Sequence, residues 1–237
     1  MRRGAAKLAL CGVLLLGACG SDNSEIELPK ITAKLLQESG KNLLPKLGVK
    51  SEGTKSQASA KPADPNAIVK KALSATKGPI ALAVRVDTNA VLAISPTGRN
   101  GDYVTWGSAP GQALVFKRGV LSNTRGLGDD LMAARIDTAV SAITSRREAS
   151  YQREHFYLGD LGQNTSLKVD CTLTRVKSER VTFGEINADA VVMKESCQRG
   201  EIKFSNVYWV DGRGRVLKSS QWIGQRLGSL AVQNLRL

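Results

Sequence analysis

Residues 204–224 carry the sequence FSNVYWVDGRGRVLKSSQWIG, in which two runs rich in aromatic and β-branched residues flank a glycine-rich turn. Residues of these types favour strands, and Gly212 and Gly214 supply the backbone freedom that a tight turn needs. The stretch therefore predicts an antiparallel β-hairpin. Taken by themselves, Tyr208 and Trp222 are interpreted as core side chains rather than as a surface on which a ligand stacks.

The same strand pattern extends outward from this hairpin, to Pro79 on one side and to the C-terminus on the other. Apolar residues alternate with more polar ones in short runs that are separated by Gly, Pro, Asn, Asp and Ser, which indicates strands joined by turns. Residues 95–101 are expected to form a loop. The expected strands are 80–86, 91–94, 102–106, 113–117, 120–123, 151–158, 167–176, 180–186, 190–198, 201–210, 216–223 and 230–237.

Two helices are expected besides the strands. Asp64 and Pro65 are a suitable start for a short helix that runs through Ala75, and residues 129–143 have helical spacing. Many short strands with tight turns favour antiparallel pairing, and about ten strands do not stay flat and open. The prediction is an all-β domain: a large antiparallel meander that curls into an open barrel or a sandwich, preceded by a short helix and interrupted by one helical insertion.

The N-terminus has the organisation of a secretory signal. Basic residues precede an apolar run, Leu8–Leu16, that is too short to span a membrane. The run ends in Leu16-Gly17-Ala18-Cys19, which is similar to the lipobox of bacterial lipoproteins; an ordinary signal peptide followed by a coincidental Cys is the alternative. We predict that residues 1–18 are removed and that Cys19 is the lipid attachment site. By resemblance to lipoprotein sorting, Gly20 in place of Asp favours the periplasmic face of the outer membrane.

Residues 19–77 are expected to form a lipidated tail and linker, and residues 78–237 the folded β-domain. Residues 51–65 show no hydrophobic periodicity and too little apolar surface to fold alone, which predicts a flexible linker. Between residues 31 and 47, Leu and Ile alternate with Lys and are interrupted by Gly40 and Pro45. This segment either lies on the membrane surface, packs on the domain or stays disordered.

The chain is strongly basic, with 34 Lys and Arg against 21 Asp and Glu and a formal charge of +13. Removal of Arg2, Arg3 and Lys7 with the signal leaves about +10, which favours anionic partners such as acidic polysaccharide, lipopolysaccharide phosphates or phospholipid headgroups. Nucleic acid is not expected as a partner, because the chain is exported and lacks a nucleic-acid-binding motif. The alternative is that the charge serves only solubility.

Two of the four cysteines are expected to pair. Cys11 leaves with the signal and Cys19 is acylated, so Cys171 and Cys197 remain in an oxidising compartment and should form a disulfide. Closing this loop would stabilise the fold by about 3–4 kcal/mol in the chain-entropy model. A metal site is not expected, because neither Cys has a CxxC partner and His155 is distant in the sequence.

Several segments of the chain form a recognisable set in this order: 103–106, 119–131, 206–211 and 220–224, together with Cys171 and Cys197. In these segments the sequence resembles the YjbF/GfcB lipoproteins, which are associated with group-four capsule and exopolysaccharide production. The resemblance covers the chain from about residue 79 to the end. It implies an outer-membrane lipoprotein with a large antiparallel β-sheet, a part in secreting or assembling extracellular polysaccharide, partners from the same export system, and no established catalytic residues.

Sequence motifs for catalysis are not found. The chain has no GxSxG elbow, no HExxH and no P-loop. His155 is interpreted as an exposed or strand-face residue, and Asp129 and Asp130 as ordinary acidic residues near a helix start rather than a glycosidase pair. We therefore expect a protein that is not an enzyme and that carries no cofactor.

Three functions are weighed. The favoured one is a non-enzymatic lipoprotein that assists export or assembly of capsular polysaccharide, binding acidic glycan or an export protein. The alternatives are a membrane-tethered hydrolase or lyase that modifies polysaccharide, and a lipid carrier with a half-open barrel.

The expected ligand contacts are Arg125, Trp209 and Trp222, because Arg offers a planar fork to acidic sugars and Trp a stacking face. Arg125 is alternatively a residue that holds the loop at 126–128. Strand alternation places Trp209 on the opposite face from Tyr208, so one of the two is expected to be more exposed.

Overall fold

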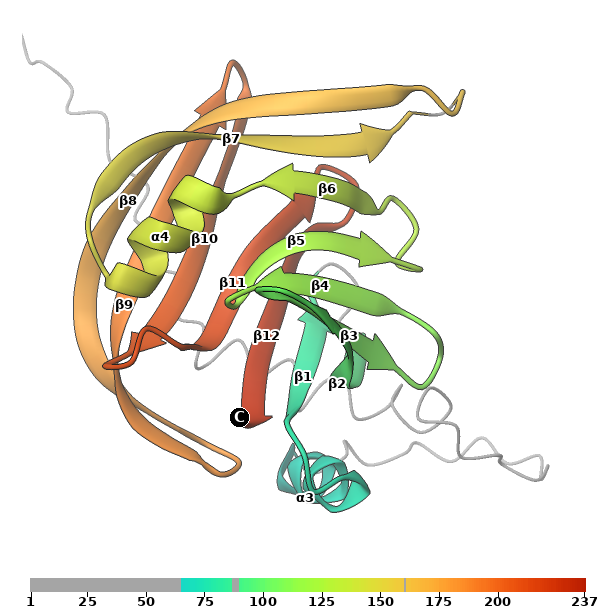
Figure 1. The fold of residues 1–237 in the computed structure, drawn as a ribbon, viewed down its shortest axis with the longest axis vertical. Coiled ribbons are helices and arrows are strands. Elements are labelled where there is room, and N and C mark those ends of the chain that lie inside the picture. The colour runs from blue at the N-terminus through green and yellow to red at the C-terminus, as the bar shows by residue number, and fades with distance from the viewer. Residues whose placement is uncertain (1–64, 87–89, 160) are drawn as a thin grey trace, which may run out of the picture.

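The computed structural model describes residues 65–86, 90–159 and 161–237 (Figure 1). The predicted signal, Cys19 and the tail up to residue 64 lie outside these residues. Within the described part, no helix is both long and apolar enough to cross a bilayer.

Two helices and twelve strands make up the described residues. The short N-terminal helix is confirmed, and so is the all-β class. The elements are α3 (Pro65–Ala75), β1 (Ile80–Arg85), β2 (Val91–Asn100), β3 (Tyr103–Ser108), β4 (Ala113–Lys117), β5 (Val120–Arg125), β6 (Leu131–Arg135), α4 (Asp137–Ser145), β7 (Ala149–Leu158), β8 (Asn164–Phe183), β9 (Ile186–Arg199), β10 (Ile202–Asp211), β11 (Val216–Gly224) and β12 (Gly228–Arg236).

All twelve strands form one sheet, in the order β5-β4-β3-β2-β1-β12-β11-β10-β9-β8-β7-β6. Every adjacent pair is antiparallel and every pair but one is consecutive in the chain; the exception joins β1, the first strand, to β12, the last. Its two end strands, β5 and β6, lie next to each other (Figure 1). The sheet is therefore a nearly closed, barrel-like meander, and of the two predicted forms the open barrel is the observed one.

Both faces of the sheet are covered near β1. Ala81 and Ala83 face the barrel interior, whereas Leu82 and Val84 face outward, where Ile68 of α3 packs against this layer. Alternation along a strand sends successive side chains to opposite faces, and burial on both faces explains why this strand is apolar throughout. The second helix, α4, packs across the inner face of β8–β10 (Figure 1).

The hairpin of β8 and β9 is long and folds over the outside of the barrel. Residues 167–176 and 180–186 were predicted as two strands, which is wrong: β8 runs unbroken for 20 residues, with a bulge between Arg175 and Lys177. The hairpin tip reaches the C-terminal strand, where the N–H of Glu185 donates to the carbonyl of Leu235 at 2.8 Å. Gly184 is required there, because a Cβ would lie 2.8 Å from that carbonyl oxygen.

Two further local predictions are corrected. The helix predicted for 129–143 begins only at Asp137, because residues 131–135 pair with β7 as a strand. The loop predicted for 95–101 belongs largely to β2, which continues to Asn100. A bulge between Pro96 and Gly98 lets β2 accommodate the proline, which has no N–H to give to a sheet.

Candidate anion-binding site

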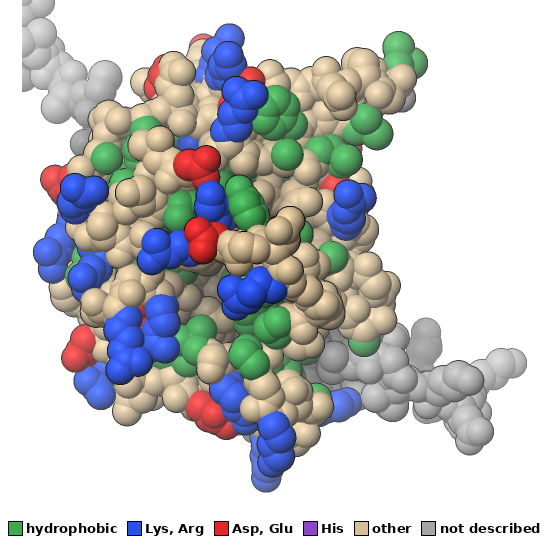
Figure 2. Space-filling model, viewed as in Figure 1, with side chains coloured by type: hydrophobic (Ala, Val, Ile, Leu, Met, Phe, Trp, Pro, Cys, Tyr) green, Lys and Arg blue, Asp and Glu red, His purple; other side chains and the backbone are tan. Residues whose placement is uncertain are grey.

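A cavity of about 340 Å³ opens at the barrel end where the β2–β3, β4–β5 and β10–β11 turns meet. Its charged lining is mainly basic: Arg99, Arg118, Arg213 and Arg215, with Asp102 as the single acid among the described residues. Lys218 also borders the cavity, but its side chain is buried and its ammonium lies over the Trp209 ring. Basic side chains also occupy much of the left and lower parts of the face in Figure 2, where acidic ones are fewer. The lining of this opening therefore carries a net positive charge.

The floor of this cavity is apolar. Trp106 and Phe116 line it together with aliphatic side chains from β1, β2, β11 and β12. Trp106 is half-buried and Phe116 is buried, so the indole presents part of its surface to the opening. The site therefore combines a ring of cations with an aromatic floor, which suits an anionic ligand that also has an apolar face.

The β10–β11 turn holds two of these arginines in place through Asp211. This nearly buried carboxylate accepts hydrogen bonds from the backbone N–H of Arg213 at 2.9 Å and of Arg215 at 2.8 Å, and pairs with the Arg215 guanidinium at 2.8 Å. Burial alone would raise the pKa of Asp211, but these contacts outweigh it and hold the pKa below its usual value. Gly214 has φ +77, and a Cβ there would lie 2.6 Å from the Thr144 carbonyl oxygen.

The β4–β5 turn is fixed from the opposite side of the barrel. Gln221 of β11 accepts a hydrogen bond from the Leu121 N–H at 2.8 Å and donates one to the Gly119 carbonyl at 3.0 Å. These bonds cross the interior and place Arg118 beside the β10–β11 turn, although about a hundred residues separate the two turns. Gln221, a positioning residue for this site, was not singled out from the sequence.

A buried polar network lies in the interior between β7, β9 and β10. Arg153 and Glu195 form an ion pair of 2.7 Å, and both side chains are almost wholly inaccessible. Glu195 also accepts hydrogen bonds from Tyr151 at 2.7 Å, Asn206 at 2.6 Å and Tyr208 at 3.2 Å. Burial and the nearby carboxylate raise the pKa of both tyrosines, so they stay protonated. The alternation of Tyr151, Arg153 and His155 along β7 was the available sequence signal, and it was missed.

The three expected ligand contacts lie in separate places, and none of them lines the basic cavity. Arg125 is exposed at the end of β5. Asp130, rather than Arg125, holds the adjacent loop by accepting hydrogen bonds from Gly126 and Leu127. Trp222 is half-buried and borders a different cavity, at the other end of the barrel.

Trp209 is only 3% exposed. Its indole N–H donates to Glu179, and the Lys218 ammonium lies 4.1 Å from the centre of its ring. Tyr208 and Trp209 do lie on opposite faces of the sheet, as predicted, but the expected difference in exposure is negligible, because both side chains are buried. The barrel interior and α4 cover Tyr208, and the long β8–β9 hairpin covers Trp209.

Two other sequence interpretations change. His155 does lie on a strand, but it faces the interior and is fully buried. Burial, with the positive charge of Arg153 as a second cause, lowers its pKa to about 3. Asp129 and Asp130 belong to the turn between β5 and β6 and not to a helix.

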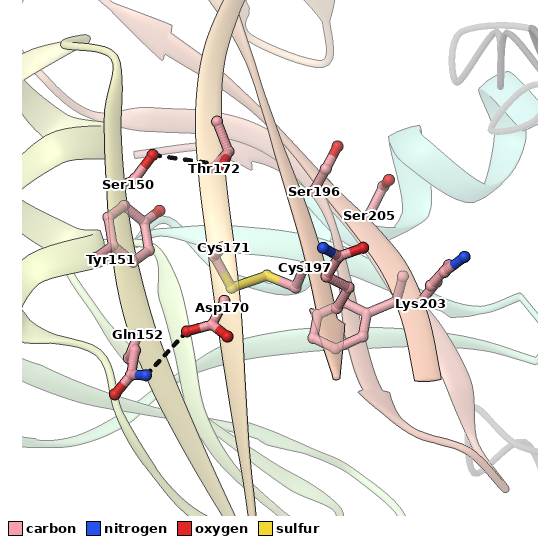
Figure 3. Close-up of a pocket in the computed structure, with 12 residues that line it drawn as sticks. Ser150, Tyr151, Gln152, Asp170, Cys171, Thr172, Ser196, Cys197, Lys203 and Ser205 are labelled. Carbon is pink, nitrogen blue, oxygen red and sulfur yellow. Dashed lines mark hydrogen bonds between the residues drawn. A yellow bond between two sulfur atoms is a disulfide. The ribbon is translucent and has the colours of Figure 1, made fainter. Parts of the chain in front are cut away.

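The predicted disulfide between Cys171 and Cys197 is confirmed and joins directly opposed residues of β8 and β9, with Cα atoms 4.1 Å apart. The Glu195 carboxylate lies close by, but the two sulfurs are bonded to each other and are unavailable as thiolate ligands. Figure 3 shows the disulfide in a groove of about 660 Å³ that runs across four strands. Its lining is mainly uncharged: besides Asp170 and Lys203 it has hydroxyl, amide and aromatic side chains, including Ser150, Gln152, Thr172 and Ser196.

The fold and the cavity define a barrel-like β-domain with a basic opening. The family model described as group 4 capsule polysaccharide lipoprotein gfcB, YjbF matches residues 53–235, and the chain belongs to this family. This match confirms the resemblance to the YjbF/GfcB lipoproteins, and the family's description links it to capsule polysaccharide.

One solved structure supports the fold. The lipoprotein YmcC from Escherichia coli K12 superimposes with a TM-score of 0.62 at 15% identity, over 78% of this chain and 98% of that chain. A Bacteroides fragilis protein described as having a YmcC-like fold gives a TM-score of 0.30 at 10% identity, over 67% of this chain and 93% of that chain. No curated protein matches the chain significantly. At 15% identity the match to YmcC supports the fold alone.

Proposed function

We propose that this protein is a non-enzymatic lipoprotein, anchored through Cys19 at the periplasmic face of the outer membrane, that assists export or assembly of capsular polysaccharide by binding its acidic residues. The observation that carries the proposal is the convergence of four arginines on one cavity with an aromatic floor. The family's link to capsule polysaccharide supports the glycan class of the ligand.

The chemistry of the cavity suits an acidic sugar. A guanidinium matches the two oxygens of a carboxylate with two parallel N–H groups, so Arg99, Arg118 and Arg213 can each bind a uronic acid or a similar anion. The exposed indole surface of Trp106 can pack on the apolar face of a sugar ring. All three arginines are solvent-exposed, which keeps each contact weak and suits a glycan that must be released again.

The binding test uses charge reversal with a matched control. Arg118→Glu with Arg213→Glu should weaken binding of polygalacturonate, used as an acidic probe, by about tenfold or more, and raised salt should reduce wild-type affinity. Arg175→Glu with Arg199→Glu changes the net charge equally on exposed positions outside the cavity, and should have a much smaller effect. Equal losses in the two double variants would show that only net charge matters and would refute the assigned site.

The cellular test separates assistance from catalysis. Deletion of the protein should abolish surface polysaccharide, and the cavity double variant should reduce it, whereas Arg175→Glu with Arg199→Glu should not. Shortened chains after incubation of the organism's own polysaccharide with purified protein would contradict the non-enzymatic role and favour the hydrolase or lyase.

A further inference from the structure

A second cavity, of about 400 Å³, opens at the opposite end of the barrel from the basic one. It lies where the β5–β6, β7–β8 and β11–β12 turns meet, which in an antiparallel meander is the end away from the β4–β5 and β10–β11 turns. Its floor is aromatic and aliphatic, from Tyr157, Leu167, Ile202 and Trp222. The rim consists mainly of polar side chains with planar groups, among them Asp129, Gln163, Gln225 and Arg226.

The indole of Trp222 is held rigidly in this floor. It stacks on Phe204 with ring centres 4.1 Å apart and planes 9° from parallel. The Trp222 backbone N–H donates to the Asn206 side-chain oxygen at 2.7 Å. This bond lies just beyond Val207 and Ser220, the last paired residues of β10 and β11 on this side. Phe204 therefore covers one side of the indole, and the His155 ring also lies near it, with ring centres 5.7 Å apart. Trp222 nevertheless remains half-buried and borders the cavity. A fixed aromatic ring loses little conformational entropy when a flat ligand packs on it.

The rim carries both signs of charge. Asp129 and Arg226 form an ion pair of 2.9 Å between two turns that are 97 residues apart, and their side chains remain 50% and 65% exposed. Asp129 and Arg226 offset each other, and Asp130 is the only other charged residue of the described lining, so this opening lacks the positive charge of the basic cavity. They still offer acceptor and donor groups at the edge of an aromatic floor.

We propose that this cavity binds an uncharged sugar ring of a glycan, with Trp222 as the stacking platform and Asp129 and Arg226 as partners for its hydroxyl groups. The C–H face of a pyranose is apolar and packs on an aromatic ring, while its equatorial hydroxyls lie at the ring edge, where planar polar side chains reach them. The proposal rests on the glycan-binding function and extends it. It assigns the acidic sugars of a glycan to the basic cavity at one end of the barrel and the neutral sugars to the cavity at the other end.

The test uses the full protein, neutral probes and an aromatic control variant. Maltohexaose and cellohexaose are titrated by calorimetry against wild type, Trp222→Ala, Trp222→Phe and Phe156→Ala. Trp222→Ala should weaken binding of a neutral oligosaccharide by about tenfold or more, whereas Trp222→Phe keeps most of the affinity. Phe156→Ala removes a half-buried aromatic side chain that lines neither cavity and should leave neutral binding unchanged.

A surface variant covers the case in which Trp222→Ala fails to fold. Asp129→Ala removes an exposed side chain and should also reduce neutral binding, by about threefold to tenfold. The proposal is overturned if neither probe binds wild type, or if Phe156→Ala and Trp222→Ala weaken neutral binding equally. Binding of polygalacturonate to wild type is measured in parallel. If wild type binds polygalacturonate but neither neutral probe, this inference alone is rejected. If wild type does not bind polygalacturonate, the proposed function is rejected.

Discussion

Acidification should destabilise this protein through His155, the chain's single histidine. The imidazole is fully buried and contacts Trp222 and Phe204, with ring centres 5.7 and 5.9 Å away. Its Nδ1 lies 3.3 Å from the Tyr157 hydroxyl, which donates its proton to the Ile223 carbonyl at 2.7 Å. Nδ1 must therefore carry the hydrogen, which leaves Nε2 as a buried acceptor without a hydrogen-bond partner among the described residues.

The size of the effect follows from the shift in pKa. Burial, together with Arg153, lowers the pKa of His155 from 6.5 to about 3 in the folded protein. The unfolded chain takes up a proton as the pH falls through 6.5, whereas the folded chain remains neutral, so folding stability is lost between these two values. By about pH 5 the loss from this one group is about 2 kcal/mol relative to neutral pH.

The assay is urea unfolding of wild type and His155→Phe near pH 7 and near pH 5, with the disulfide intact. Phenylalanine fits the aromatic surroundings and removes the unpartnered nitrogen, so the variant should be at least as stable as wild type at neutral pH. Its stability should fall by about 2 kcal/mol less than that of wild type on acidification. Carboxylates titrate in both proteins and cancel in the comparison. An identical pH dependence in the two would refute the reasoning.

Three further predictions concern the network, the disulfide and the turn. Arg153→Met leaves Glu195 buried without its cation and should lower the free energy of unfolding by about 3–5 kcal/mol, measured by urea unfolding. A loss under about 1 kcal/mol would mean that the tyrosine hydroxyls and water are enough to stabilise the buried carboxylate. Replacing Cys171 and Cys197 together by Ala should cost about 3–4 kcal/mol, measured against the oxidised protein, and an unchanged midpoint would contradict this. The depressed pKa of Asp211 stabilises the folded state above pH 3.8, its value in the unfolded chain, and this contribution is lost as the pH falls below that value. Asp211→Asn should remove this pH-dependent contribution. Acid-unfolding curves that run parallel for wild type and the variant would argue against it.

Local patterns in the sequence were enough for the elements that local physics controls. Alternating residues predicted most strands, the glycine-rich turn predicted the β10–β11 hairpin, and Asp64 with Pro65 predicted the start of α3. The Cys171–Cys197 pair could be predicted because only two cysteines remain once the signal is removed and Cys19 is taken as acylated. Helical spacing failed at 129–143 because apolar residues three or four apart also suit a short strand followed by a helix, and only pairing with β7 decides between them.

The candidate sites could not be predicted in the same way, because they depend on which turns the closed sheet brings together. Pairing of β1 with β12 joins strands from opposite ends of the domain, and curling then places Arg118 beside Arg213 at one opening and Asp129 beside Arg226 at the other. Trp209 shows the same limit: its strand pattern indicated a face but not that the β8–β9 hairpin would cover it. The sequence by itself determined most of the strands and turns and the positive charge. Only the tertiary structure decided where charge and aromatic rings meet, because contacts between distant segments follow from sheet closure and not from local periodicity.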